Sequence, residues 1–307
     1  MDTPVLFLVF NRPDCTRQSF EAIRAACPSK LYIAADGPRR GRDEELQTTS
    51  LVRSIATAVD WPCDVATMFQ VDNLGCKQAV VSALDWFFKN EEAGIIIEDD
   101  CLPNADFFPY CEALLQRYAT NEKVALISGA NFVPHSAERK YTYRFSRYAN
   151  IWGWASWRRT WQMYDKDIVF WPAWKSSSDW QNLFRDPFER CYWERLLNET
   201  HGGRIDTWDY QLAACMWHRH MYSVCPNANL VANIGFDSNA THTRHTVKQL
   251  SLGHIDKIFH PPEVCPDIHS DAWFFENRLG GRFMRWPLNV LAKPRALLDQ
   301  IRRGAAR

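Results

Sequence analysis

The chain alternates short apolar runs with longer stretches in which apolar residues recur at helical spacing. The apolar runs predict strands at residues 5–10, 31–35, 65–69, 95–97 and 124–127. The periodic stretches between them predict helices at about residues 15–26, 51–59, 76–88 and 105–118, with a solvated loop at 39–45. Because alternating strands and helices form parallel sheets with right-handed crossovers, residues 1–130 predict an α/β fold with a mostly parallel sheet flanked by helices.

Polar side chains follow directly after four of the predicted strands. These side chains are Asn11 and Arg12, then Asp36, then Asp72 and Asn73, and finally Glu98, Asp99 and Asp100. The carboxyl ends of parallel strands meet at one edge of a sheet, and open α/β sheets bind ligands at that edge. We therefore expect these side chains to converge on one crevice.

The acidic triplet of Glu98, Asp99 and Asp100 is the strongest chemical signal. Adjacent ionised carboxylates cannot be buried without partners, so they end the strand abruptly. Hard oxygen ligands at this place suit Mg²⁺ or Mn²⁺ carrying a phosphorylated substrate. Such triplets also occur as solvated loops, but the preceding Ile-rich strand favours a site for a sugar nucleotide.

The second half of the chain loses the regular rhythm beyond about residue 132. Residues 151–161 predict a short strand or loop that enters a helix. Further helices are predicted at about 188–198 and from about 207 to 218, the latter with Thr207 or Asp206 as its cap. Residues 222–226 and 228–234 are predicted to be extended. Many of the 14 tryptophans lie between Trp152 and Trp217. Each of them either packs in the core or forms a flat platform for a sugar ring.

Composition narrows the class of protein. The 307 residues allow one large domain or two small ones, and 36 basic against 36 acidic side chains give no indication of a nucleic-acid partner. Ten scattered cysteines without a Cys-x-x-Cys pair indicate reduced, buried thiols and not a secreted disulfide framework or a zinc site. The first apolar run is short and lacks a basic flank, so we expect neither a signal peptide nor a membrane span, and a cytoplasmic location.

The C-terminal segment is basic. Residues 278–307 contain eight Arg or Lys and one Asp, a net charge of +7, interleaved with apolar residues. One hypothesis is a peripheral contact with an anionic membrane surface, and the other is a docked helix with a charged outer face.

Together, the segment Asn11-Arg12-Pro13, Asp36 after a strand, the triplet and Asp106-Phe107-Phe108 resemble glycosyltransferases of the GT-A fold. The sequence is most similar to the N-acetylglucosaminyltransferase I family and to bacterial hemolysin-like or sugar-nucleotide transferases. The resemblance is firm over residues 4–130, weaker over 140–245 and absent after that. It implies a catalytic domain at 1–250, with a nucleotide-binding half (1–130) and an acceptor-binding half (131–250), followed by an extension at 251–307.

The resemblance also implies roles for individual residues. Asp100 would bind the divalent metal, Asp99 would face the ribose, and Glu98 would orient the site. Arg12 and Asp36 match the positions that hold the uracil and ribose, although Asp36-Gly37-Pro38 departs from the family's loop.

The remaining roles fall in the second half of the chain. Asp209 opens a predicted helix and resembles the position of the catalytic base, with Asp206 as the competitor, although either residue could be only a helix cap. His242 would complete the metal or diphosphate site, with Arg244 nearby. The aromatic residues expected at the acceptor pocket are Trp152, Trp154 and Trp157.

These expectations define an inverting, metal-dependent transfer of a sugar from a nucleotide donor to a glycan or lipid-linked acceptor of the cell surface. A UDP-sugar is the expected donor, with UDP-N-acetylglucosamine as one candidate. One rival is a nucleotidyl- or phosphotransferase, but Asn11-Arg12-Pro13 stands where that class carries a Gly-rich loop. The other rival is a non-catalytic glycan-binding or membrane-associated scaffold.

Overall fold

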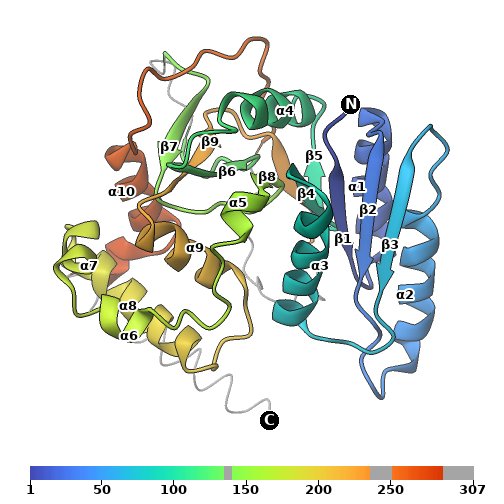
Figure 1. The fold of residues 1–307 in the computed structure, drawn as a ribbon, viewed down its shortest axis with the longest axis horizontal. Coiled ribbons are helices and arrows are strands. Elements are labelled where there is room, and N and C mark those ends of the chain that lie inside the picture. The colour runs from blue at the N-terminus through green and yellow to red at the C-terminus, as the bar shows by residue number, and fades with distance from the viewer. Residues whose placement is uncertain (135–139, 236–250, 286–307) are drawn as a thin grey trace.

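The structure is a computed structural model and describes residues 1–134, 140–235 and 251–285. Its centre is an eight-stranded sheet with the order β3-β2-β1-β4-β8-β6-β9-β7 (Figure 1). The strands are β1 (Val5–Val9), β2 (Lys30–Ala35), β3 (Asp64–Phe69), β4 (Ala93–Glu98), β6 (Val124–Ser128), β7 (Tyr143–Ser146), β8 (Trp154–Trp157) and β9 (Tyr222–Pro226). Within this sheet only β7 and β8 run against the common direction. The predicted α/β class with a mostly parallel sheet is confirmed.

Helices cover both faces of the sheet. They are α1 (Pro13–Ala26), α2 (Asp43–Ala56), α3 (Cys76–Asn90), α4 (Phe107–Arg117), α5 (Arg158–Trp161), α6 (Trp171–Trp174), α7 (Ser178–Leu183), α8 (Pro187–His201), α9 (Asp209–His218), α10 (Ile268–Asn277) and the 3-10 turn η1 (Gly281–Met284). A small antiparallel pair, β5 (Cys101–Pro103) with β10 (Val231–Asn233), lies beside the main sheet. Figure 1 shows β1 to β4 toward one end of the sheet and β6, β7 and β9 toward the other.

Alternation along β1 creates two hydrophobic cores. Val5, Phe7 and Val9 pack in one core with side chains of α1, α2 and α4. Leu6 and Leu8 pack in the other with side chains of α3 and α9. All five residues are buried, as expected for a strand covered on both faces. These layers hold the carboxyl ends of β1, β2 and β4 in fixed positions.

A third core explains the abundance of tryptophan. It contains five buried indoles contributed by α6, α7, α8 and α9, namely Trp171, Trp174, Trp180, Trp193 and Trp217. Trp171 and Trp180 meet edge to face with ring centroids 4.8 Å apart, which is a favourable aromatic geometry. Most tryptophans of the second half therefore build the scaffold.

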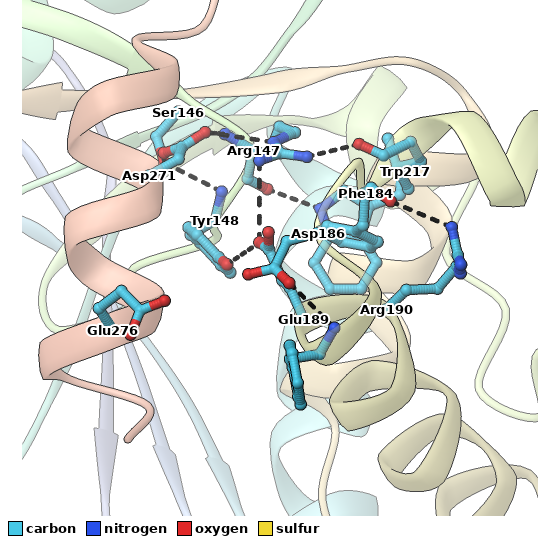
Figure 2. Close-up of polar contacts among 12 residues, drawn as sticks. Ser146, Arg147, Tyr148, Phe184, Asp186, Glu189, Arg190, Trp217, Asp271 and Glu276 are labelled. Atoms are coloured by element: carbon cyan, nitrogen blue, oxygen red, sulfur yellow. Dashed lines mark hydrogen bonds and ion pairs between the residues drawn. The ribbon is translucent and has the colours of Figure 1, made fainter. Parts of the chain in front are cut away.

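A buried ionic network joins this third core to the C-terminal helix α10. Asp271 accepts hydrogen bonds from Ser146 Oγ (2.5 Å) and from the Arg147 backbone N–H (3.1 Å), as Figure 2 shows. The Arg147 guanidinium also lies 3.7 Å from Glu189 Oε1 and donates to the carbonyl of Leu183. Burial raises the pKa of Asp271 and of Glu189, while Arg147 lowers both. The network therefore fixes α10 and α8 against the strand β7.

Several helices and strands differ from those predicted from the sequence. Helix α2 begins at Asp43, inside the predicted solvated loop, because three acidic residues in its first turn favour a helix N-terminus. Two strands, β5 at residues 101–103 and β7, were not predicted. The short strand entering a helix at 151–161 is confirmed as β8 followed by α5.

All ten cysteines are free, and four of them are buried, whereas Cys27, Cys191 and Cys265 are exposed, so the expectation of buried thiols holds only in part. Among the described helices, none combines the length and the apolar character needed to cross a membrane.

Candidate active site

A pocket of about 620 Å³ lies at the carboxyl ends of β1 to β4, which is the edge predicted from the sequence. Residues at or just beyond the ends of four different strands contribute to its lining, among them Arg12, Asp36, Asn73 and Glu98. Residues 205–210, at the start of α9, form part of the lining as well. Asp72 lines a smaller neighbouring hollow instead. Pockets of this size bury most of a drug-sized ligand.

Arg12 bridges two acids of the triplet. Its Nη1 donates to Asp100 Oδ2 (2.8 Å) and its Nη2 to Asp99 Oδ1 (2.5 Å). Ser19 on α1 donates to the backbone carbonyls of Asp99 (2.9 Å) and Cys101 (3.1 Å), which holds the acidic turn in place. Burial alone would lower the pKa of Arg12, but Asp99 and Asp100 raise it above its usual value. The arginine is therefore a fixed cation within the triplet.

Glu98 is the acid of the triplet that remains outside this bridge. Burial, followed by the charges of Asp100 and Asp99, raises its pKa to about 8. Burial also raises the pKa of Asp99, to about 6, against the opposing effect of Arg12. One guanidinium thus does not balance three neighbouring carboxylates at neutral pH, and the site favours an additional cation or a proton.

Asp36 shapes the loop between β3 and α3. Its Oδ1 accepts the backbone N–H groups of Gly37 (2.8 Å) and Leu74 (2.9 Å), and its Oδ2 accepts the side-chain amide of Asn73 (2.7 Å). Burial raises the pKa of Asp36, and the backbone hydrogen bonds oppose that effect. Asp36 lines the pocket as predicted, but much of its hydrogen-bonding capacity holds this loop.

The two candidates for the catalytic base, Asp206 and Asp209, differ in exposure and in their hydrogen-bond partners. Asp206 is exposed, and its Oδ1 accepts the backbone N–H of Lys77 at the start of α3 (3.3 Å), so Asp206 caps that helix. Asp209 is the first residue of α9, is half-buried, and accepts a hydrogen bond from Thr207 Oγ1. Unpaired N–H groups at a helix N-terminus favour an ionised carboxylate.

The three aromatic residues predicted at the acceptor pocket lie in different environments. Trp152 lines the pocket and is half-buried. Trp154 and Trp157 are buried in β8, at 1% and 4% exposure, and do not line the pocket. Because β8 is covered on both faces, these two side chains expose almost no surface, and their contact with an acceptor stays a prediction. Trp208, which the sequence did not single out, stacks on Trp154 with centroids 5.7 Å apart and reaches the pocket.

Two small residues also shape the pocket without having been predicted. Gly235 lies against the acidic turn, since a Cβ there would be 2.5 Å from Asp100 Oδ2 and 2.6 Å from Arg12 Nη1. Cys76 begins α3 among four carboxylates, and burial followed by these charges raises its pKa to about 12. Gly235 directly follows Ile234 and Cys76 directly follows Gly75, so no polar residue directly before either one marks it in the sequence.

The expected metal site is incomplete within the described residues. In that part of the chain no three His, Cys, Asp or Glu side chains are placed to hold a metal ion. Asp100 Oδ2 is also engaged with Arg12. His242 and Arg244 lie outside the described residues, as does most of the basic C-terminal segment. The oxygen donors present would suit a hard cation that takes its other ligands from a phosphorylated substrate and water.

The fold and the pocket define an α/β protein with an acid-rich pocket at the carboxyl edge of its parallel strands. Six carboxylates line the pocket with only two arginines, Arg12 and Arg39, among the described residues; the six are Asp36, Glu98, Asp99, Asp100, Asp206 and Asp209.

The sequence matches no family model and no curated protein. Among solved structures it is similar to a UDP-glucose pyrophosphorylase complexed with UDP-glucose, with 10% identity, a TM-score of 0.38, and coverage of 74% of this chain and 90% of that chain. It is similar to HddC from Yersinia pseudotuberculosis, with 11% identity, a TM-score of 0.32, and coverage of 55% and 85%. It is also similar to the galactosyltransferase LgtC with donor and acceptor sugar analogues, with 10% identity, a TM-score of 0.34, and coverage of 70% of each chain. Likenesses this weak leave the activity to be argued from the pocket itself.

Proposed function

We propose that this protein is an enzyme that uses a nucleotide sugar and transfers the sugar, with inversion, to an acceptor hydroxyl. The observation that carries the proposal is the gathering of Arg12, Asp99, Asp100 and Asp209 around one pocket of about 620 Å³. The acids come from the end of a parallel strand, and Asp209 comes from the start of a helix. These are the parts needed to bind a diphosphate and to accept a proton.

In this proposal Asp209 accepts the proton of the acceptor hydroxyl. The freed oxygen attacks the anomeric carbon, and the bond from that carbon to the diphosphate breaks. Negative charge then develops on the leaving nucleoside diphosphate, and Arg12 lies in the pocket to interact with it. Trp152 offers a flat apolar surface on which a sugar ring can stack.

A divalent cation fits the proposal through Asp100, with the diphosphate supplying further oxygen ligands. When bound, such an ion stabilises the charge of the leaving diphosphate. The excess of carboxylates over arginines in the pocket supports this part of the proposal. We further propose Mg²⁺ or Mn²⁺ as the ion, a UDP-sugar such as UDP-N-acetylglucosamine as the donor, and a glycan or lipid-linked acceptor.

Thermal unfolding with UDP, GDP, CMP and ADP, each with and without Mn²⁺, tests the proposal. We expect one nucleotide to raise the melting temperature, and to raise it more with Mn²⁺, because binding stabilises the folded state. No stabilisation by any of the four would contradict the proposal and favour the non-catalytic scaffold. The protein is then incubated with a nucleotide sugar that has the same base as the stabilising nucleotide. This experiment separates a glycosyltransferase from a nucleotidyltransferase. Release of a nucleoside diphosphate indicates glycosyl transfer, whereas pyrophosphate-dependent formation of a nucleoside triphosphate indicates nucleotidyl transfer.

A further inference from the structure

Arg278 ends helix α10 and lies on two aromatic rings near the pocket. Its Cζ is 4.7 Å from the centre of the Phe132 ring and 5.5 Å from that of Trp152. The two rings meet edge to face with centroids 4.8 Å apart. Trp152 also lines the pocket, so the guanidinium lies beside a ring that forms part of the pocket wall.

The charge of Arg278 is not balanced by a carboxylate in the described ranges, where no ion pair is found for it. Two other partly buried arginines pair with carboxylates, Arg12 with Asp99 and Asp100 and Arg147 with Asp271. Buried Arg144 instead donates to the neutral oxygens of Pro226, Asn227 and Asn131. Arg278 is half-buried, and burial lowers its pKa. A partly desolvated cation gains from a bound anion, and stacking on aromatic rings leaves the edge of the guanidinium free to donate.

The position of Arg278 is fixed by the network of Figure 2. Asp271 is anchored to Ser146 and Arg147, and Arg278 follows it by seven positions, which is about two helical turns. Both side chains therefore lie on the same side of α10, which packs against β7. The C-terminal extension, for which no family resemblance was found, thus brings a cation to the acceptor half.

We propose that Arg278, on its Phe132–Trp152 support, forms an anion-binding subsite beside the pocket, and that the acceptor carries a phosphate or a carboxylate that binds there. That the bound anion belongs to a sugar acceptor rests on the proposed function, whereas the anion site itself does not. A local cation is needed for such an acceptor, because the carboxylates that line the pocket repel an anion.

Calorimetric titration of the full chain tests the subsite with two probes, hexyl phosphate and glucuronic acid, and with hexanol and glucose as their neutral counterparts. We expect an anionic probe to bind, and Arg278→Gln to weaken it about tenfold or more. Arg278→Lys should retain part of the affinity, because the charge stays while the planar fork is lost. Arg282→Gln is the matched control, since Arg282 lies on Phe283 and away from Trp152.

Each outcome has a defined meaning. Arg278-dependent binding of hexyl phosphate supports a lipid-phosphate acceptor, and the same pattern with glucuronic acid supports an acidic saccharide. Failure of both probes to bind the native protein, or equal binding to native and Arg278→Gln proteins, overturns the subsite. UDP is titrated into the same samples. Lack of UDP binding counts against the proposed function and leaves the result with the anionic probes standing on its own.

Discussion

Arg12 and Asp100 are separated by 88 positions in the sequence, yet Arg12 Nη1 lies 2.8 Å from Asp100 Oδ2 in the pocket. The pair joins the end of β1 to the end of β4, two strands that are adjacent and parallel. The acidic turn therefore carries its own cation. Under the proposed function, a bound diphosphate would have to accommodate or redirect this guanidinium.

Replacing Arg12 by Met should destabilise the protein by about 2 kcal/mol, because it leaves Asp99 and Asp100 without their charge partner. Urea unfolding at pH 7 measures the loss. Arg17→Met is the control, since Arg17 forms only an exposed pair with Asp14. Equal stability of the two variants would show that the bridge contributes nothing.

Asp209→Asn should reduce the rate of sugar transfer by a factor of about 100 or more, with nucleotide binding retained, because the base that accepts the proton is lost. Steady-state kinetics with nucleotide titration separates the two effects. Asp206→Asn keeps an oxygen acceptor for the N–H of Lys77 and should retain most of the activity. If Asp206→Asn were the inactive variant, the assignment of the base would be reversed.

Gly235→Ala should weaken nucleotide binding. The added methyl group would lie 2.5 Å from Asp100 Oδ2, so the Arg12–Asp100 pair must shift. Thermal shift with the nucleotide and Mn²⁺ measures the effect. Gly202→Ala is the control because its Cβ meets nothing closer than 3.1 Å. Unchanged binding by Gly235→Ala would show that the pair can move freely.

Without divalent cations, stability should fall as the pH rises from about 5 to 8. The pKa of Glu98 is raised to about 8 in the folded protein, so the folded state binds more protons than the unfolded chain in this window. Glu98→Gln should remove much of this fall, so that the change in melting temperature between pH 5 and 8 is smaller by a few degrees than in the native protein. Exposed Glu263→Gln is the control, and an identical pH profile for native and Glu98→Gln proteins would contradict the prediction.

Arg147→Met should cost about 3 kcal/mol of stability, since it leaves Asp271 and Glu189 buried without their cation. Unfolding in guanidinium chloride measures the free energy of unfolding of this variant and of the control, Arg195→Met. Arg195 is exposed and lies on the same helix as Glu189. Because the network anchors α10, Arg147→Met should also weaken anion binding at Arg278. A loss no larger than that of the control would rule out a structural role for the network.

The sequence by itself determined the strands β1 to β4, their alternation with helices, and the placement of polar side chains at their carboxyl ends. Period and run length are local properties, and a parallel sheet necessarily brings those strand ends to one edge. For this reason Arg12, Asp36, Asp99 and Asp100 could be assigned to one crevice before the structure was known. Asp209 could be assigned to a helix start in the same way.

Only the tertiary structure decided which neighbouring residues face the pocket. Trp152 and Trp154 are two positions apart, but β8 is inserted between β4 and β6 and its residues are buried on both faces. Asp206 accepts the backbone N–H of Lys77, 129 positions earlier in the first turn of α3, and Arg278 reaches Trp152 because α10 is anchored through Asp271. Contacts of this range depend on strand insertion and helix docking, and no local pattern of residues encodes them.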